Sequence, residues 1–328
     1  MDLSEFLLIF VCIQNFGLID ASDGDRSPFY QKCLKSCTSA NCTKDGLSLS
    51  EKALKHQDVG SRLLRWGCKD ECQYHCMWRT VLGFQERGYE IPKFHGKWPF
   101  VRLFGVQEPA SAFASLLNLA VHVHMYREIT SQFSVKTTPL VLFWHGFVVV
   151  CVHAWTWSTI FHTRDTPFTE FMDYACALSM VMALFVAAVV RVFHRRKKLT
   201  LGILLLPLLY YIEHVRYLYS GRIDYEYNMQ VNVFFGVAGS LIWLVWSIIQ
   251  YLGGRWYAWR MVAFTLLSGA ALALELFDFP PKYHAWDAHA LWHLSTAPLP
   301  VLFYRFVIED LRFLQSSQFV EKDNLKLT

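Results

Sequence analysis

Apolar residues dominate the chain from about residue 109 onward, in stretches of about 20 residues separated by short polar links. Each stretch is long enough for a helix to cross the roughly 30 Å hydrocarbon core of a bilayer. The first stretch is the least apolar, because it has an Ala- and Ser-rich start and contains His122 and His124. The pattern predicts an all-α membrane protein with seven transmembrane helices, at approximately 109–126, 139–161, 171–192, 200–219, 229–251, 258–277 and 288–307.

A shorter apolar run, from Phe6 to Ile13, opens the chain. It is too short to span a bilayer, and Ala21 follows at a plausible cleavage point before a polar, acidic stretch. This predicts a signal peptide over residues 1–21. Asp2 and Glu5 stand where basic residues are usual, so an uncleaved anchor is the alternative.

Six cysteines cluster in the segment 22–108 that follows, at Cys33, Cys37, Cys42, Cys68, Cys72 and Cys76. An even, dense set behind a signal peptide predicts disulfides in an oxidising compartment, with metal binding as the alternative. The four-residue spacing places cysteines on one helical face, which favours two short helices bridged face to face. The pairing stays open. Asn41-Cys42-Thr43 is a glycosylation sequon, which agrees with a lumenal segment.

The amount and the placement of charge both bear on the class of protein and on its orientation. Charged residues make up 18% of the chain, below the roughly one quarter of soluble domains. Its Lys and Arg residues flank apolar runs rather than forming a groove-sized patch, so nucleic-acid binding is not expected. With a lumenal N-terminus, the cytosolic links carry eight basic residues and the lumenal links three. The His-Arg-Arg-Lys-Lys run at 194–198 dominates this positive-inside bias, and the tail at 309–328 is then cytosolic.

Polar residues from three predicted spans fall at one membrane depth, near the lumenal boundary. Ser158 and His162 share a face at the end of span two, and Asp173 lies in the first turn of span three. His289 and His293 share a face where span seven begins. Any one of these residues alone is easily explained as structural, whereas ionisable residues gathered within a membrane indicate function. Glu275 and Asp278 close span six near the same face and are candidates to support the site.

Two histidines at i and i+4 with a third on a facing helix are typical of catalytic zinc. His162, His289 and His293 are therefore the expected Zn²⁺ ligands. Bound zinc lowers the pKa of water to about 7. Asp173 is then expected to accept a proton and pass it to the leaving group. Ser158 is expected to donate a hydrogen bond to the metal-bound oxygen or to the developing oxyanion.

The spacing of these residues resembles the CREST superfamily of membrane hydrolases. Within it, several strings resemble the post-GPI-attachment-to-proteins factor three family, its Per1-like branch. They are CKDECQYHCMW (68–78), FHGKWPF (94–100), QEPASA (107–112), WSTIFHTRDT (157–166) and DAHALWH (287–293). The resemblance implies a seven-helix hydrolase over 109–308 in the Golgi membrane, reached through the endoplasmic reticulum. By motif, the same three histidines match the zinc ligands, and Ser158 and Asp173 match the catalytic pair.

The resemblance further implies the substrate. Such an enzyme removes the sn-2 acyl chain from the phosphatidylinositol of GPI-anchored proteins, a phospholipase A2-type ester hydrolysis within membrane lipid. Two alternatives remain. A ceramidase-like amidase could use the same metal site, and a lipid receptor or assembly chaperone could hold a structural zinc.

Overall fold

The computed structural model describes residues 22–221 and 223–327, so the predicted signal peptide lies outside the described residues. The chain divides into two compact units, Met1–Gly105 and Val106–Thr328. The described residues are helical and contain no β-strand, only isolated bridges. The all-α prediction is therefore confirmed for the described part of the chain.

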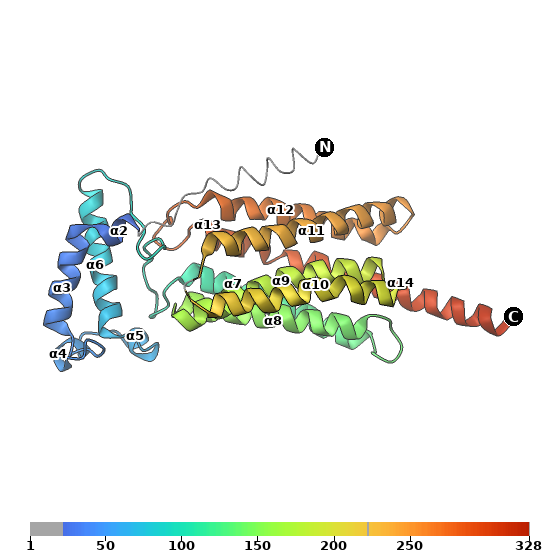
Figure 1. Cartoon of the computed structure of the whole chain (residues 1–328), viewed down its shortest axis with the longest axis horizontal. Coiled ribbons are helices and arrows are strands. Elements are labelled where there is room, and N and C mark those ends of the chain that lie inside the picture. The colour runs from blue at the N-terminus through green and yellow to red at the C-terminus, as the bar shows by residue number, and fades with distance from the viewer. Residues whose placement is uncertain (1–21, 222, 328) are drawn as a thin grey trace. The chain divides into compact units, whose positions relative to one another are not determined.

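The first unit is built on two helices, α3 and α6, which lie side by side (Figure 1). Three disulfides bridge them. The bonds pair Cys33 with Cys76, Cys37 with Cys72, and Cys42 with Cys68. The predicted face-to-face bridging of two short helices is confirmed, and the pairing, which the spacing left open, runs antiparallel. The helices of this unit are α2 (Asp23–Arg26), α3 (Pro28–Asn41), α4 (Glu51–Leu54), α5 (Val59–Leu63) and α6 (Cys68–Gln85).

The connection that leaves α6 is anchored back onto the unit by Arg102. Its guanidinium lies 3.6 Å from the ring centroid of Trp66 and 3.2 Å from a carboxylate oxygen of Glu71. Trp66 in turn donates to the carbonyl oxygen of Gly105 over 2.8 Å. A Cβ on Gly60 would lie 2.2 Å from the Phe104 carbonyl, so this close backbone approach requires glycine.

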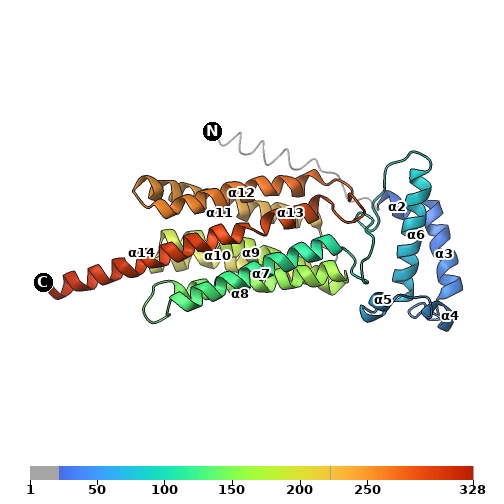
Figure 2. The same cartoon turned by 180° about the vertical axis from the view of Figure 1, so that it is seen from behind.

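The second unit is a bundle of long helices that run side by side (Figures 1 and 2). Aromatic and aliphatic side chains of α7, α8, α9, α11, α12 and α14 form its main core, around Trp144, Phe147, Trp243 and Phe303. Its helices are α7 (Pro109–Gln132), α8 (Val141–Thr163), α9 (Pro167–Val192), α10 (Lys197–Tyr219), α11 (Tyr225–Leu252), η2 (Trp256–Ala258), α12 (Trp259–Phe277), α13 (Ala288–Thr296) and α14 (Leu299–Leu327).

Local sequence explains where these helices begin. Proline occupies the first turn of α7 and α9, where its missing N–H costs no hydrogen bond. Side chains cap the start of three helices: Thr166 accepts from Thr169 N, Asp224 from Tyr227 N, and Asp287 from Ala290 N.

Five helices among the described residues are long and apolar enough to cross a membrane: Val141–Thr163, Pro167–Val192, Lys197–Tyr219, Tyr225–Leu252 and Trp256–Phe277. They match predicted spans two to six. The first predicted span is also a helix, α7, but it is not among these five because its residues are too polar on average.

The seventh predicted span differs from the single helix expected over 288–307. The structure has two helices, α13 and α14, separated by a turn at Ala297 and Pro298. Proline lacks the N–H that would continue the helix, and its ring clashes with the preceding turn. The single-helix expectation was wrong at this point, and the break leaves α13 as a short element at the site.

Candidate metal centre

Three histidines from two helices meet at one end of the bundle. His162 lies in the last turn of α8, and His289 and His293 lie one turn apart on α13. The Nε2 atom of His289 is 3.4 Å from that of His162 and 2.8 Å from that of His293. The capping of α13 by Asp287 fixes the helix start that gives both residues one face. The structure thus brings the three predicted ligands together.

The outward ring nitrogens of these histidines are each engaged by another side chain. His162 Nδ1 lies 2.7 Å from Glu108 Oε2, and His289 Nδ1 lies 2.7 Å from Glu275 Oε2. His293 Nδ1 lies 3.2 Å from Ser115 Oγ. Carboxylates and hydroxyls in these positions hold an imidazole in one tautomer and orientation, which leaves Nε2 for a metal.

The arrangement fits a zinc ion. Neutral imidazoles are good zinc ligands, and nitrogens about 2.0–2.1 Å from a tetrahedral zinc lie about 3.3 Å apart. The distance between His162 and His289 matches this spacing, while the 2.8 Å between His289 and His293 is tighter. The side chains of His162 and Glu108 are almost fully buried, at 2% and 6% exposure. His293 is also buried, whereas the His289 side chain is 33% exposed. An imidazole cluster with carboxylates behind it suits a divalent cation, because the carboxylates offset its charge.

The two predicted catalytic residues are placed differently. Ser158 lies one turn before His162 on α8, is buried, and reaches the cluster through Ser115, whose Oγ is 3.1 Å away. Asp173 lies on α9, which packs against α8. Because α9 starts at Pro167 rather than near 171, Asp173 is in its second turn, not its first, and is half-buried. The roles of both residues stay predictions.

Two side chains that engage imidazole rings of the cluster, those of Glu108 and Ser115, were missed from the sequence. Both belong to α7 or its first flanking residue, in the stretch that was least apolar. One feature of the sequence could have indicated Glu108. It is an acidic residue directly before Pro109, where the first predicted span begins, and therefore at the depth expected for the histidines. Glu275, a candidate for support, is confirmed as a partner of His289.

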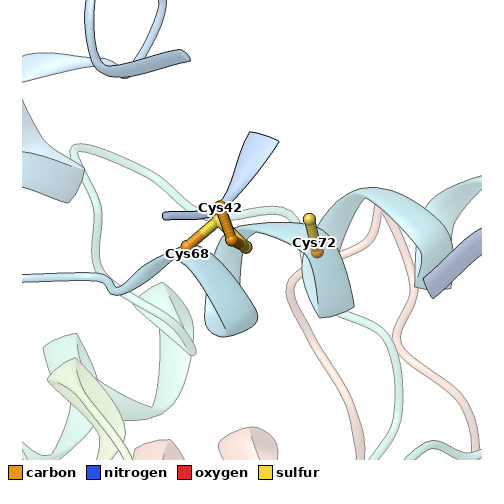
Figure 3. Close-up of side chains that lie close together, drawn as sticks. All are labelled: Cys42, Cys68 and Cys72. Atoms are coloured by element: carbon orange, nitrogen blue, oxygen red, sulfur yellow. A yellow bond between two sulfur atoms is a disulfide. The ribbon is translucent and has the colours of Figure 1, made fainter. Parts of the chain in front are cut away.

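A second group of potential ligand atoms is formed by Cys42, Cys68 and Cys72 in the first unit (Figure 3). Cys42 and Cys68 are bonded to each other, and Cys72 is bonded to Cys37. Cysteine binds zinc as the thiolate, and a sulfur in a disulfide is oxidised and carries no such charge. The structure therefore favours disulfides over the metal-binding alternative for these cysteines.

Comparison with known proteins places the chain in a family. Residues 59–311 match the model of the Per1-like family. The Drosophila melanogaster protein "Post-GPI attachment to proteins factor 3" is 46% identical over 290 residues, 88% of each chain. Two proteins named "GPI-specific phospholipase A2-like PGAP3" are 40% identical: the Xenopus laevis protein over 95% of this chain and 96% of its own, and the Homo sapiens protein over 91% and 92%. The chain belongs to the Per1-like family.

Proposed function

We propose that this protein is a zinc-dependent hydrolase that removes the sn-2 acyl chain from the phosphatidylinositol of GPI-anchored proteins. The relatives' name, GPI-specific phospholipase A2-like, supports the substrate class and the ester bond. The observation that carries the zinc dependence is the convergence of three imidazole Nε2 atoms, each backed through Nδ1 by another side chain.

Each residue has a stated task in this proposal. His162, His289 and His293 would hold the zinc ion, which supplies Lewis acidity and lowers the pKa of water to about 7. Asp173 takes up the proton released from water and returns it to the leaving alcohol. Ser158 donates a hydrogen bond to the oxyanion that develops on the ester carbonyl.

The proposed membrane placement accounts for the position of the site. The five apolar helices, α7, and the pair α13 and α14 would make seven crossings with a lumenal N-terminus, following the positive-inside bias. His162 at the end of α8 and His289 at the start of α13 then lie about one helical turn, ~5.4 Å, inside the lumenal boundary. Phospholipid ester bonds occupy that depth, just below the headgroups.

Sequence patterns and the family resemblance support the processing and the location of the chain. Residues 1–21 would be a cleaved signal peptide, and 22–108 a lumenal cysteine-rich segment glycosylated at Asn41. The domain at 109–308 would lie in the Golgi membrane, with the tail at 309–328 in the cytosol.

Replacing the two catalytic candidates tests this function. Ser158→Ala and Asp173→Ala should leave expression and zinc content intact. Acyl release should fall by about 10²-fold or more in each variant. Asp173→Ala removes the group that transfers the proton, and Ser158→Ala removes the hydroxyl that donates to the oxyanion. The readout is mass spectrometry of the lipid on a GPI-anchored reporter, with ceramide offered in parallel.

The matched control is Ser179→Ala, which removes a membrane-helix hydroxyl that donates to the Cys176 carbonyl oxygen of its own helix. It should remodel anchors normally. Normal remodelling by both catalytic variants would contradict the mechanism. Hydrolysis of ceramide in place of the GPI lipid would favour the amidase alternative.

A further inference from the structure

One face of α7 is polar although it is buried. Ser111, Ser115, Asn118 and His122 recur at spacings of three and four residues, and each is at most 6% exposed. Such spacing places the four side chains on one face of a helix. Polar groups inside a membrane protein are costly unless they have partners, so this face calls for an explanation.

Glu108, the residue before this helix, holds His162 from two sides. Its carboxylate Oε2 is 2.7 Å from His162 Nδ1, and its backbone N donates to the His162 carbonyl oxygen over 3.0 Å. That carbonyl belongs to the last turn of α8, where no intrahelical donor is available. One residue therefore fixes both the backbone and the ring of a predicted ligand.

Asn118 fixes His293 through its backbone. Its Nδ2 donates to the His293 carbonyl oxygen over 2.8 Å. Because α13 ends at Thr296, the N–H of Ala297 bonds to Leu294 and not to the His293 carbonyl. That carbonyl accepts instead from two side chains, the Thr296 hydroxyl of its own helix over 2.9 Å and Asn118 of α7. Asn118 supplies a donor across the helix interface and so secures the turn of α13 that presents the imidazole.

Ser115 joins His293 to Ser158 in a chain with a direction. When His293 Nε2 faces the metal position, Nδ1 carries the proton and donates to Ser115 Oγ, 3.2 Å away. The Ser115 hydroxyl is then available to donate to Ser158 Oγ, 3.1 Å away. Because the Ser158 oxygen accepts the hydrogen bond from Ser115, the Ser158 hydroxyl can donate its own hydrogen to a different acceptor.

We propose that α7 is the positioning helix of the candidate zinc site. Glu108 and Asn118 hold His162 and His293 in place for the metal. Ser115 sets the direction of the Ser158 hydroxyl, so that it donates to the substrate oxyanion. This inference rests on the proposed zinc-dependent function and adds three positioning residues that touch neither the metal position nor the substrate.

Zinc affinity of the full-length protein, measured by competition with a chelator, tests the first part. Glu108→Ala and Asn118→Leu should weaken zinc binding about 10–100-fold, as loss of such supporting partners does elsewhere. Glu108→Gln has the same shape and keeps an oxygen that accepts from Nδ1–H, so its affinity should fall between wild type and Glu108→Ala. The visible absorption of Co²⁺-loaded protein should shift in the same order, since it reports ligand geometry.

Ser111→Ala is the matched control. Ser111 lies one turn before Ser115 on the same buried face, and its Oγ has no hydrogen-bond partner among the residues that the structure describes. Removing an unpaired buried hydroxyl leaves no group unsatisfied, so zinc affinity and acyl release should match wild type.

Ser115→Ala tests the second part. Because Ser115 acts through Ser158, this variant should lose at least 10-fold in kcat for acyl release with KM unchanged, measured at zinc concentrations that saturate the site. Wild-type zinc affinity in both Glu108→Ala and Asn118→Leu, or unchanged kcat in Ser115→Ala, would overturn the positioning role. A wild-type protein that binds no zinc would overturn the proposed function instead.

Discussion

A buried ion pair connects α9 to α14 at the end of α9 remote from its first turn. Arg191 Nη2 donates to Asp310 Oδ1 over 2.7 Å, and the Tyr257 hydroxyl donates to the same oxygen over 2.9 Å. Both charged side chains are nearly inaccessible, at 4% and 1% exposure. Removing a charge from water costs free energy, and in this pair the attraction between the two charges offsets that cost. Either charge alone would remain buried with no such compensation.

Removing one partner of this pair should therefore destabilise the bundle strongly. Asp310→Ala is expected to lower the free energy of unfolding by about 3–5 kcal/mol. Thermal unfolding of the detergent-solubilised protein measures this. The double variant Arg191→Met/Asp310→Leu should recover most of the loss, because no unpaired charge remains.

The adjacent carboxylate provides the control. Glu309 pairs with Arg312 at the surface, with both side chains over a third exposed. Glu309→Ala should change the free energy of unfolding by less than about 1 kcal/mol. Equal stability of Asp310→Ala and Glu309→Ala would show that the buried pair contributes little.

At the scale of elements, α3 and α6 depend on their cross-links. Apart from the cystines, the buried core of this unit is small, with Tyr30, Val81 and Phe94 at its centre. Small domains of this kind usually need disulfides, because they bury too little apolar surface to fold alone. The sequence separation across Cys37–Cys72 is 35 residues.

Removing that central disulfide should destabilise the first unit. In the chain-entropy model, a loop of this size corresponds to about 3–4 kcal/mol. Cys37→Ser/Cys72→Ser should speed amide hydrogen exchange in α3 and α6 and leave α8 and α13 unchanged. Mass spectrometry of peptides from unreduced wild type should recover the three pairs of the structure. Peptides joined by other pairs would contradict the antiparallel arrangement.

Element boundaries show how far apolar patterning reaches. Spans two to six were predicted as helices, because long apolar runs specify a helix and a membrane together. The pattern ended the first span at 126, whereas α7 continues to Gln132, since polar residues can extend a helix beyond an apolar run. Pro298 marks the break after α13. The prediction missed this break because it followed hydropathy alone, and the residues around Pro298 are apolar on both sides.

At the scale of the whole molecule, the site joins residues far apart in sequence. His162 and His289 are 127 positions apart, and Glu108 is 54 positions from His162. Topology alone predicted a common depth for the histidines, because alternate helix ends meet at one membrane face. It could not predict which helices are lateral neighbours, so the contacts of Glu108 and Ser115 with the histidines were missed. Lateral packing depends on side-chain shape across helices, which no local pattern records.

The central claim is that these three imidazoles bind one zinc ion. Its most direct test is the metal content of purified wild type beside His162→Ala/His289→Ala/His293→Ala, by inductively coupled plasma mass spectrometry. Wild type should contain close to one zinc per chain and the triple variant close to none, with the disulfides of both intact. Equal zinc in both proteins, or no zinc in wild type, would contradict the account.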